Sequence, residues 1–137
     1  MRQTTWSIRV YYEDTDSYGI VYYANYLKYM ERGRTEHMRT LGFDQASTHA
    51  ELDLIFPVRR VEVDYLQAAV FDDLLNVETQ VAVVSGAKME FEQIIRRQQD
   101  DIIICKAKVM VASICASTFR PIRLPKPIYS ALEAENG

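Results

Sequence analysis

Apolar and polar side chains alternate along most of this chain, the period-two pattern of strands that bury one face. The pattern predicts five strands, over residues 6–12, 61–65, 75–83, 89–95 and 103–111. Turn signals at Ser85–Gly86 and Gln98–Asp101 separate the last three of these segments. Because short turns join strands that lie side by side, we predict that consecutive strands pair in an antiparallel meander.

One segment follows the helical period instead. Residues 25–41 place a largely apolar stripe at three- and four-residue spacing, through Leu27, Met30, Arg34, Met38 and Leu41. We predict that Asn25 caps the start of this helix and that Gly42 ends it. Gly33 lies in the middle, where glycine costs roughly 1 kcal/mol relative to alanine. We therefore expect this helix to approach its neighbour closely at Gly33.

The order of elements is one strand, one long helix and four strands, which predicts an α+β fold. A sheet covered by one helix buries its apolar surface only if it curls around that helix. Its outer face and edges still invite pairing with a second copy, so we predict a homo-oligomer. The tail contains Pro121, Pro125 and Pro127 and is expected to cross the surface before a short helix near Pro127.

Length, charge and cysteine content bound the class of protein. The 137 residues suit one domain spanning 1–137, and a net charge of −3 argues against a nucleic-acid binder. We find no signal-peptide pattern and no apolar run near the roughly 20 residues that span a bilayer. Cys105 and Cys115 form no CxxC pair, and we expect both to be buried free thiols. These features predict a cytoplasmic protein.

The segment before the long helix carries the most informative chemistry. Glu13, Asp14 and Asp16 lie in a polar loop that leads directly to the predicted helix start. A helix start offers free N–H groups and a positive dipole end, which polarise a carbonyl or hold an anion. A carboxylate beside it can attack the carbonyl or activate water. The residues alone fit better with acids that only cap and solvate the loop, so both interpretations stay open at this point.

This loop resembles the signature D-x-D-x-x-G-x-V-Y/F-x-x-x-Y/F of the 4-hydroxybenzoyl-CoA thioesterase family, through residues 14–26. The helix from Tyr29 to Glu36 and the segments 63–65 and 71–74 are similar to those of the YbgC-type (tol-pal-associated) acyl-CoA thioesterases in that family. The similarity covers residues 5–125 in order and spacing. It implies a hotdog fold, in which a curved antiparallel sheet wraps around one long helix and pairs into dimers and often tetramers. It also implies hydrolysis of acyl-CoA to free acid and CoA, with no metal or organic cofactor.

The resemblance assigns roles to particular residues. It implies that Asp16, the second acid of the signature, is the catalytic carboxylate, as nucleophile or general base. It implies that the backbone N–H near Tyr23 holds the thioester oxygen as charge builds on it. The implied substrate-binding residues are Gly19, Val21, Tyr22, Asn25 and Lys88. Lys88 is expected to reach across a dimer to CoA phosphates, although this chain has Gly86 and Ala87 where some family members carry an arginine pair.

Other residues are weaker candidates. Asn25 fits equally well as a plain cap, and Asp14 is better explained by a role in shaping the loop. Glu31 is expected to pair with Arg34 or Thr35 on the helix surface, and His37 to pack or lie at the surface rather than act as a base. The further cations considered for the CoA phosphates are Arg59, Arg60, Arg120, Arg123 and Lys126.

The sequence lacks the motifs of several other enzyme classes, including the G-x-S-x-G elbow, H-E-x-x-H and a Gly-rich phosphate loop. Two other functional hypotheses stay open. The protein could be a non-catalytic acyl-CoA-binding module, or an interaction module loosely associated with envelope or lipid-synthesis proteins. A hotdog dehydratase is a third and weaker hypothesis, since the helix lacks the Asp/His arrangement of those enzymes. The acyl group and a preference for acyl-carrier protein are also open, although the resemblance favours aliphatic acyl-CoA. Five tyrosines either wall the acyl pocket or pack the sheet on the helix: Tyr18, Tyr22, Tyr23, Tyr26 and Tyr29.

Overall fold

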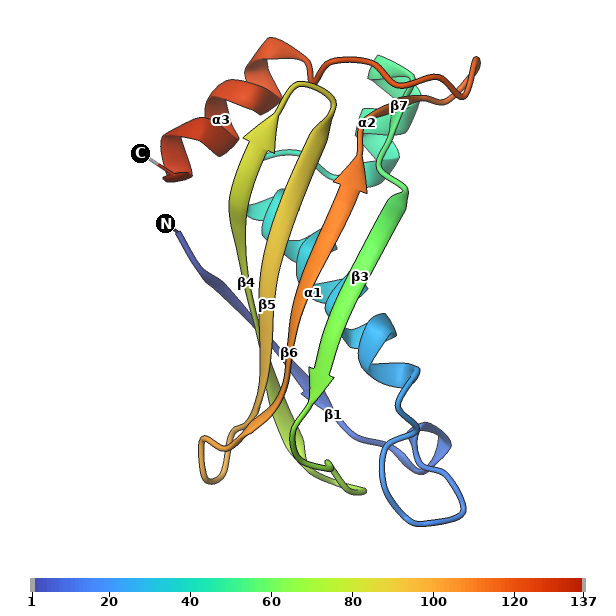
Figure 1. Ribbon diagram of the computed structural model, residues 1–137, viewed down its shortest axis with the longest axis vertical. Helices are drawn as coiled ribbons and strands as arrows, with labels where there is room; N and C mark the ends of the chain where they lie inside the picture. The colour runs from blue at the N-terminus through green and yellow to red at the C-terminus, as the bar shows by residue number, and fades with distance from the viewer. Residues whose placement is uncertain (1, 137) are drawn as a thin grey trace.

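The computed structural model describes residues 2–136, and in it a five-stranded antiparallel sheet curves around helix α1 (Figure 1). The strands lie in the order β1-β4-β5-β6-β3. Their bounds are Thr4–Arg9 for β1, Leu74–Ser85 for β4, Lys88–Arg97 for β5, Ile103–Ala112 for β6 and Val58–Tyr65 for β3. Helix α1 spans Asn25–Thr40. The predicted α+β fold, a curved sheet around one long helix, is confirmed.

Strands β4, β5 and β6 form the predicted meander, but β3 does not join it in sequence order. Strand β3 pairs with β6 at the far edge, because β1 already occupies the free side of β4. The connection from β3 to β4, residues 66–73, therefore crosses the end of the sheet at which α1 begins (Figure 1). The prediction that all four strands follow one another was wrong at this step, and the crossing places residues 66–73 beside the site described below.

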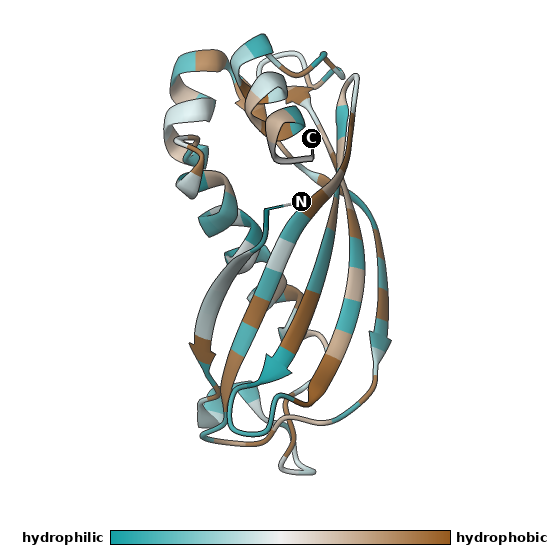
Figure 2. Cartoon of the chain, turned by 90° about the vertical axis from the view of Figure 1, so that its left-hand side faces the viewer, coloured by the Kyte–Doolittle hydropathy of each residue, from teal (hydrophilic) through white to brown (hydrophobic). Residues whose placement is uncertain are grey.

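Alternate positions along the strands point inward and form the core with α1. Leu75, Val77 and Ile95 are fully buried on β4 and β5, and Tyr29 and Met30 of α1 are buried against the sheet. The alternation appears in Figure 2 as brown and teal bands along the longer strands. It arises because successive side chains of a strand point to opposite faces.

Helix α1 approaches the sheet closely at Gly33, as predicted. A Cβ atom added there would lie 2.7 Å from Cγ1 of Val77 and 2.8 Å from Oγ1 of Thr79. The buried Gln93 lies under the same turn, where its Nε2 donates to the Met30 carbonyl and to the Thr79 hydroxyl, each at 2.9 Å. Only glycine fits this position without displacing buried neighbours.

Of the two predicted ends of α1, only the C-terminal one is confirmed. Gly42 ends the helix as predicted, at a φ of +92° and with its N–H bonded to the Arg39 carbonyl. At the start, however, the capping residue is Ala24, and Asn25 is the first helical residue. The predicted Asn25 cap was wrong because its side chain instead donates a hydrogen bond to the Asp14 carbonyl at 2.8 Å.

Strand β1 ends at Arg9, before the end of the alternating pattern of residues 6–12, because Tyr12–Asp14 form a 3-10 turn. Two features were not predicted from the sequence: helix α2, Gln45–Leu52, and the small sheet of β2, Leu54–Ile55, and β7, Ile114–Cys115. The helix expected near Pro127 is present as α3, Lys126–Asn136. Its buried residues Ile128 and Leu132 extend the core at the end of the sheet opposite the start of α1 (Figure 1).

The outer face of the sheet is charged rather than apolar. A hollow on it is lined by acidic and basic side chains, including Glu62, Glu92 and Lys108. The outward positions of the strands are mostly polar, and the pairing of this face or of the sheet edges with a second copy stays a prediction. The edge strand β3 remains exposed along almost its whole length. Within residues 2–136, no helix combines the length and apolarity needed to cross a membrane.

Both cysteines are free thiols. Cys105 is buried as predicted, and burial raises the pKa of its thiol to about 12. Cys115 is only partly buried, so that prediction was wrong for this residue; β7 belongs to the small sheet outside the main core. Its Sγ lies 3.3 Å from Oδ2 of Asp53.

Candidate active site

The acidic loop before α1 folds back on itself. A bridge pairs Thr15 with Val21, the N–H of Asp16 donates to the Ile20 carbonyl at 2.9 Å, and the N–H of Gly19 donates to the Asp16 carbonyl at 3.0 Å. Gly19 has a φ of +81°, a left-handed conformation that glycine adopts without steric cost. The predicted residues Asp16, Gly19 and Val21 thus lie in one tight turn.

The Asp16 carboxylate is held by one oxygen and open at the other. Its Oδ1 accepts a hydrogen bond from the N–H of Tyr18 at 2.8 Å. Its Oδ2 has no hydrogen bond or ion pair with any residue among 2–136. The side chain is partly exposed. This arrangement fixes the carboxylate while leaving one oxygen available to a substrate or a water molecule.

The start of α1 provides unpaired hydrogen-bond donors beside this loop. The N–H of Val21 donates to the Ala69 carbonyl and that of Tyr22 to the Asp14 carbonyl, each at 2.9 Å. The next two N–H groups, of Tyr23 and Ala24, donate to no acceptor in the described part of the chain. They lie at the positive end of the helix dipole, where an oxygen that gains negative charge is stabilised.

Asp14 organises the loop, the role predicted for it from the sequence. Its Oδ2 accepts a hydrogen bond from the N–H of Tyr11 at 2.8 Å, and its carbonyl accepts from Asn25 and from the N–H of Tyr22. The buried Tyr29 hydroxyl lies close to the carboxylate. Burial, and next the adjacent Asp14 carboxylate, raise the pKa of Tyr29. Asp14 therefore joins the loop to the first turns of α1.

The five tyrosines divide into two groups. Tyr26 and Tyr29 are buried and pack the sheet against the helix, which is the second of the two roles considered for them. Tyr18, Tyr22 and Tyr23 are exposed by 86%, 47% and 59%. The Tyr23 ring meets that of Tyr65, on the edge strand β3, at 5.9 Å. In a single chain the predicted site is therefore an open surface rather than an enclosed pocket.

Lys88 lies far from the other predicted site residues. It is the first residue of β5, at the end of the sheet opposite the start of α1 (Figure 1). There it lines a depression together with Arg59, and Arg123 and Lys126 line a second depression beside Gly86. The basic candidates thus gather at the end of the molecule away from Asp16.

Two further side chains on α1 have structural roles. The Thr35 hydroxyl donates to Oε1 of Glu31 at 2.9 Å, one of the two partners expected for Glu31. His37 is fully buried, with its Nδ1 2.8 Å from the Thr4 hydroxyl and its ring against Phe91. His37 therefore packs in the core, as expected, and does not face the acidic loop.

Residues 66–73 contact the loop directly, although no role was predicted for them from the sequence. The Ala69 carbonyl accepts from Val21, Val70 pairs with Ile20, and the Phe71 ring stacks on Tyr12 with 3.7 Å between ring centroids. The signal available was the resemblance of residues 71–74 to the thioesterase pattern. It marked the segment without indicating what the segment touches.

The fold of this chain is similar to that of solved thioesterase structures. A 4-hydroxybenzoyl-CoA thioesterase mutant, solved in complex with 4-hydroxybenzoyl-CoA, superposes with a TM-score of 0.90 at 19% identity, covering 96% of this chain and 99% of that one. A probable thioesterase from Bartonella henselae has a TM-score of 0.85 at 35% identity, covering 90% and 100%. The sheet wrapped around α1 is therefore a hotdog fold.

The sequence comparisons then identify the family. The acyl-CoA thioesterase YbgC of Haemophilus influenzae is 45% identical over 124 residues, which cover 90% of each chain. The thioesterase-like superfamily matches residues 10–132. The chain belongs to this superfamily, and the resemblance stated from the motif is confirmed.

Proposed function

We propose that this chain hydrolyses acyl-CoA thioesters to the free acid and CoA. In this proposal Asp16 acts as nucleophile or general base, and the N–H of Tyr23 donates a hydrogen bond to the thioester oxygen. The reaction class is supported by the relationship to YbgC from Haemophilus influenzae. One observation carries the assignment to this site. Among residues 2–136, the Tyr23 N–H has no acceptor and Oδ2 of Asp16 has no partner, and both lie where the loop meets α1.

The chemistry requires both groups at once. Attack on the carbonyl carbon moves negative charge to its oxygen, and the donor at the helix start stabilises that charge. The C–S bond then breaks, and CoA leaves as a thiolate that takes up a proton. Asp16 supplies either the attacking oxygen or the base that removes a proton from water. We propose that Gly19, Val21, Tyr22 and Asn25 form the wall around the thioester.

The test is release of free thiol from a panel of CoA thioesters with short, medium and long aliphatic chains and benzoyl-type groups. We expect turnover, with aliphatic esters preferred, and the same panel carried on acyl-carrier protein establishes the carrier preference. Binding of acyl-CoA without turnover of any ester would instead support the acyl-CoA-binding module. A stable envelope or lipid-synthesis protein that co-purifies with the chain would add the interaction role to either result.

We further propose that the chain acts as a dimer or tetramer in which β3 strands of two copies pair. Strand β3 is an exposed edge of eight residues, and an unpaired edge is a template for another strand. Antiparallel pairing about a two-fold axis places the Val58 end of one strand beside the Tyr65 end of the other. Because Tyr65 contacts Tyr23, this brings the basic end of one copy to the Asp16 loop of the other.

Analytical ultracentrifugation tests the assembly with a matched pair of variants. Val61 on β3 and Val83 on β4 are each 39% exposed. We expect Val61→Lys to shift the assembly toward smaller species, because it places a charge in the proposed interface, and Val83→Lys to leave the contact between β3 strands intact. A wild type that sediments as a monodisperse monomer contradicts the proposal.

Lys88 is proposed to bind a CoA phosphate across this dimer. An ammonium–phosphate hydrogen bond is charge-assisted, so we expect Lys88→Ala to raise KM for acyl-CoA by about tenfold with little change in kcat. The matched control is Lys106→Ala, which removes an exposed lysine from the outer face of the sheet. An unaltered KM in Lys88→Ala would exclude Lys88 from this role.

A further inference from the structure

Residues 66–73, here called the β3–β4 connection, are bonded through Ala69 both to the acidic loop and to helix α1. The carbonyl of Ala69 accepts the N–H of Val21 at 2.9 Å. The N–H of Ala69 donates to the buried hydroxyl of Tyr26, in the first turn of α1, at 3.1 Å. Ala69 is itself fully buried. The position of this residue therefore sets the position of the loop relative to the helix start.

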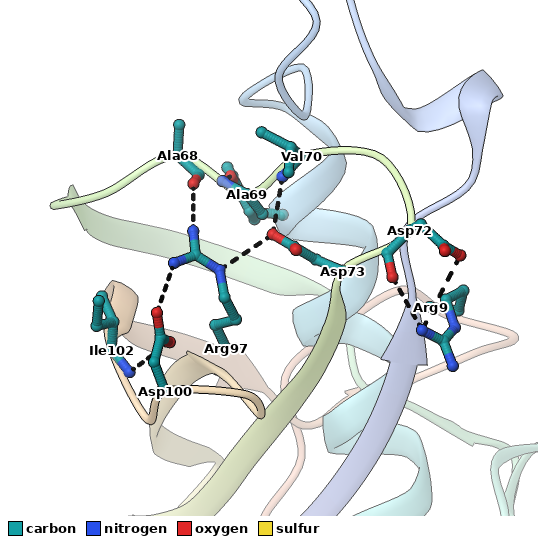
Figure 3. A network of polar contacts seen from close by, with 10 residues as sticks. Arg9, Ala68, Ala69, Val70, Asp72, Asp73, Arg97, Asp100 and Ile102 are labelled. Carbon is teal, nitrogen blue, oxygen red and sulfur yellow. Dashed lines mark hydrogen bonds and ion pairs between the residues drawn. The ribbon is translucent and has the colours of Figure 1, made fainter.

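A second set of contacts holds Ala69 from the side opposite the loop. Arg97, the last residue of β5, donates from Nη2 to the Ala68 carbonyl at 2.9 Å and from Nε to Oδ2 of Asp73 at 3.1 Å (Figure 3). The same Asp73 oxygen accepts the N–H of Val70 at 3.0 Å. Arg97 thus fixes the residue before Ala69 directly and the residue after it through Asp73.

The Arg97 side chain is itself held in place. Its Nη1 donates to Oδ2 of Asp100 at 3.0 Å, across the β5–β6 turn. The Arg97 and Asp73 side chains are exposed by only 19% and 13%. A planar guanidinium that binds three acceptors at once loses little freedom for each bond, unlike an exposed and mobile ion pair. The network therefore restrains the β3–β4 connection from the end of a rigid strand.

We propose that Arg97 is a positioning residue for catalysis, which acts through the β3–β4 connection on the loop that holds Asp16. The chain of contacts runs from Arg97 to Asp73 and Ala68, then to Ala69, and then to Val21. Val21 lies two residues before the Tyr23 N–H and pairs with Thr15, next to Asp16. The inference rests on the proposed function of Asp16 and Tyr23.

The neighbouring residue Arg96 provides a matched control. It lies on the opposite face of β5 and forms a comparable ion pair, with its Nε 3.0 Å from Oε1 of Glu78 and side chains exposed by 26% and 19%. The Arg96 pair joins β5 to β4 and does not touch the connection. Arg96→Gln therefore removes the same charge and a similar contact without disturbing Ala69.

We expect Arg97→Gln to lower kcat by about tenfold or more with KM changed by less than about threefold, because small displacements of catalytic groups cost rate rather than binding. Arg96→Gln is expected to keep kcat within about twofold of the wild type. Arg97→Lys retains the charge near Asp73 but not the three-way contact, so an intermediate kcat is expected. If Arg97→Gln does not fold, Arg97→Lys serves as the test variant.

Two further measurements separate positioning from general stability. Amide hydrogen exchange in residues 13–22 is expected to accelerate in Arg97→Gln and to stay unchanged in Arg96→Gln. In an Asp16→Asn background, Arg97→Gln is expected to lower the remaining rate far less than in the wild type, because both changes affect one unit. Equal kcat losses in the two arginine variants, or unchanged exchange in residues 13–22, would overturn the inference. Full activity of Asp16→Asn would instead refute the proposed function, while the exchange result still decides the role of Arg97.

Discussion

Replacing Asp16 with asparagine is expected to lower the turnover of acyl-CoA by roughly 10²-fold or more. Asparagine is neither a nucleophile nor a base at neutral pH, so the attacking group or its activator is lost. The loop itself should survive, because the asparagine oxygen still accepts the Tyr18 N–H that Oδ1 of Asp16 binds. The measurement is free-thiol release under saturating acyl-CoA, together with the affinity for the same ester.

The matched control is Glu13→Gln, which removes a neighbouring carboxylate. Glu13 is exposed, and its side chain has no hydrogen bond or ion pair within residues 2–136. We expect its kcat to stay within about twofold of the wild type, since loss of an exposed charge has little local effect. Equal rates for the wild type and Asp16→Asn would remove Asp16 from the mechanism.

Isotope labelling then distinguishes the two roles of Asp16. If its carboxylate attacks the carbonyl carbon, a mixed anhydride forms, and water that hydrolyses it at the Asp16 side leaves one solvent oxygen in the protein. If Asp16 activates water, the solvent oxygen appears only in the released acid. A single turnover in ¹⁸O-water, followed by mass measurement of the peptide that contains Asp16, tests direct attack, because only an anhydride opened at the Asp16 carbonyl puts solvent oxygen into the peptide. Label in the peptide supports direct attack.

The sequence predicted the local elements well, because they depend on local patterns. Strands β4 and β5 alternate along most of their length and β6 through its middle, and the end of α1 follows from the conformation that Gly42 adopts. Helix α2 escaped notice because Thr48 is its only buried residue, so no apolar stripe marks it. The signal that was present is Asp44, whose side chain accepts the N–H of Ser47 and caps the helix.

The arrangement of the elements was harder to predict, because it depends on contacts distant in sequence. The position of β3 beside β6 follows from the pairing of β1 with β4, which no local pattern encodes. For the same reason the motif indicated Asp16 and the helix start but not the support they receive from Ala69 and Arg97. The large distance between Lys88 and Asp16 within one chain likewise could not be predicted, because it depends on the direction in which the strands run.

Replacing Gly33 with a larger residue is expected to destabilise the fold strongly. The added Cβ would lie under 3 Å from Val77 and Thr79, two β-branched side chains that are stiff at χ1. Overpacking of a core costs about 1–3 kcal/mol, whereas the gain in helix propensity from glycine to alanine is only about 1 kcal/mol. We expect Gly33→Ala to lower the free energy of unfolding in urea, and Gly33→Leu not to accumulate as folded protein.

A second substitution tests whether the clash is the cause. Val77→Ala removes the Cγ1 atom that lies 2.7 Å from the added Cβ, and it leaves space in the core. If the close approach determines the cost, Gly33→Ala should destabilise the Val77→Ala background less than it destabilises the wild type. The two changes would then be coupled by about 0.5–3 kcal/mol, the range found for residues in contact. Strict additivity, or a Gly33→Ala variant that is more stable than the wild type, would mean that helix propensity outweighs packing at this turn. Glycine would then not be required for α1 to lie against the sheet.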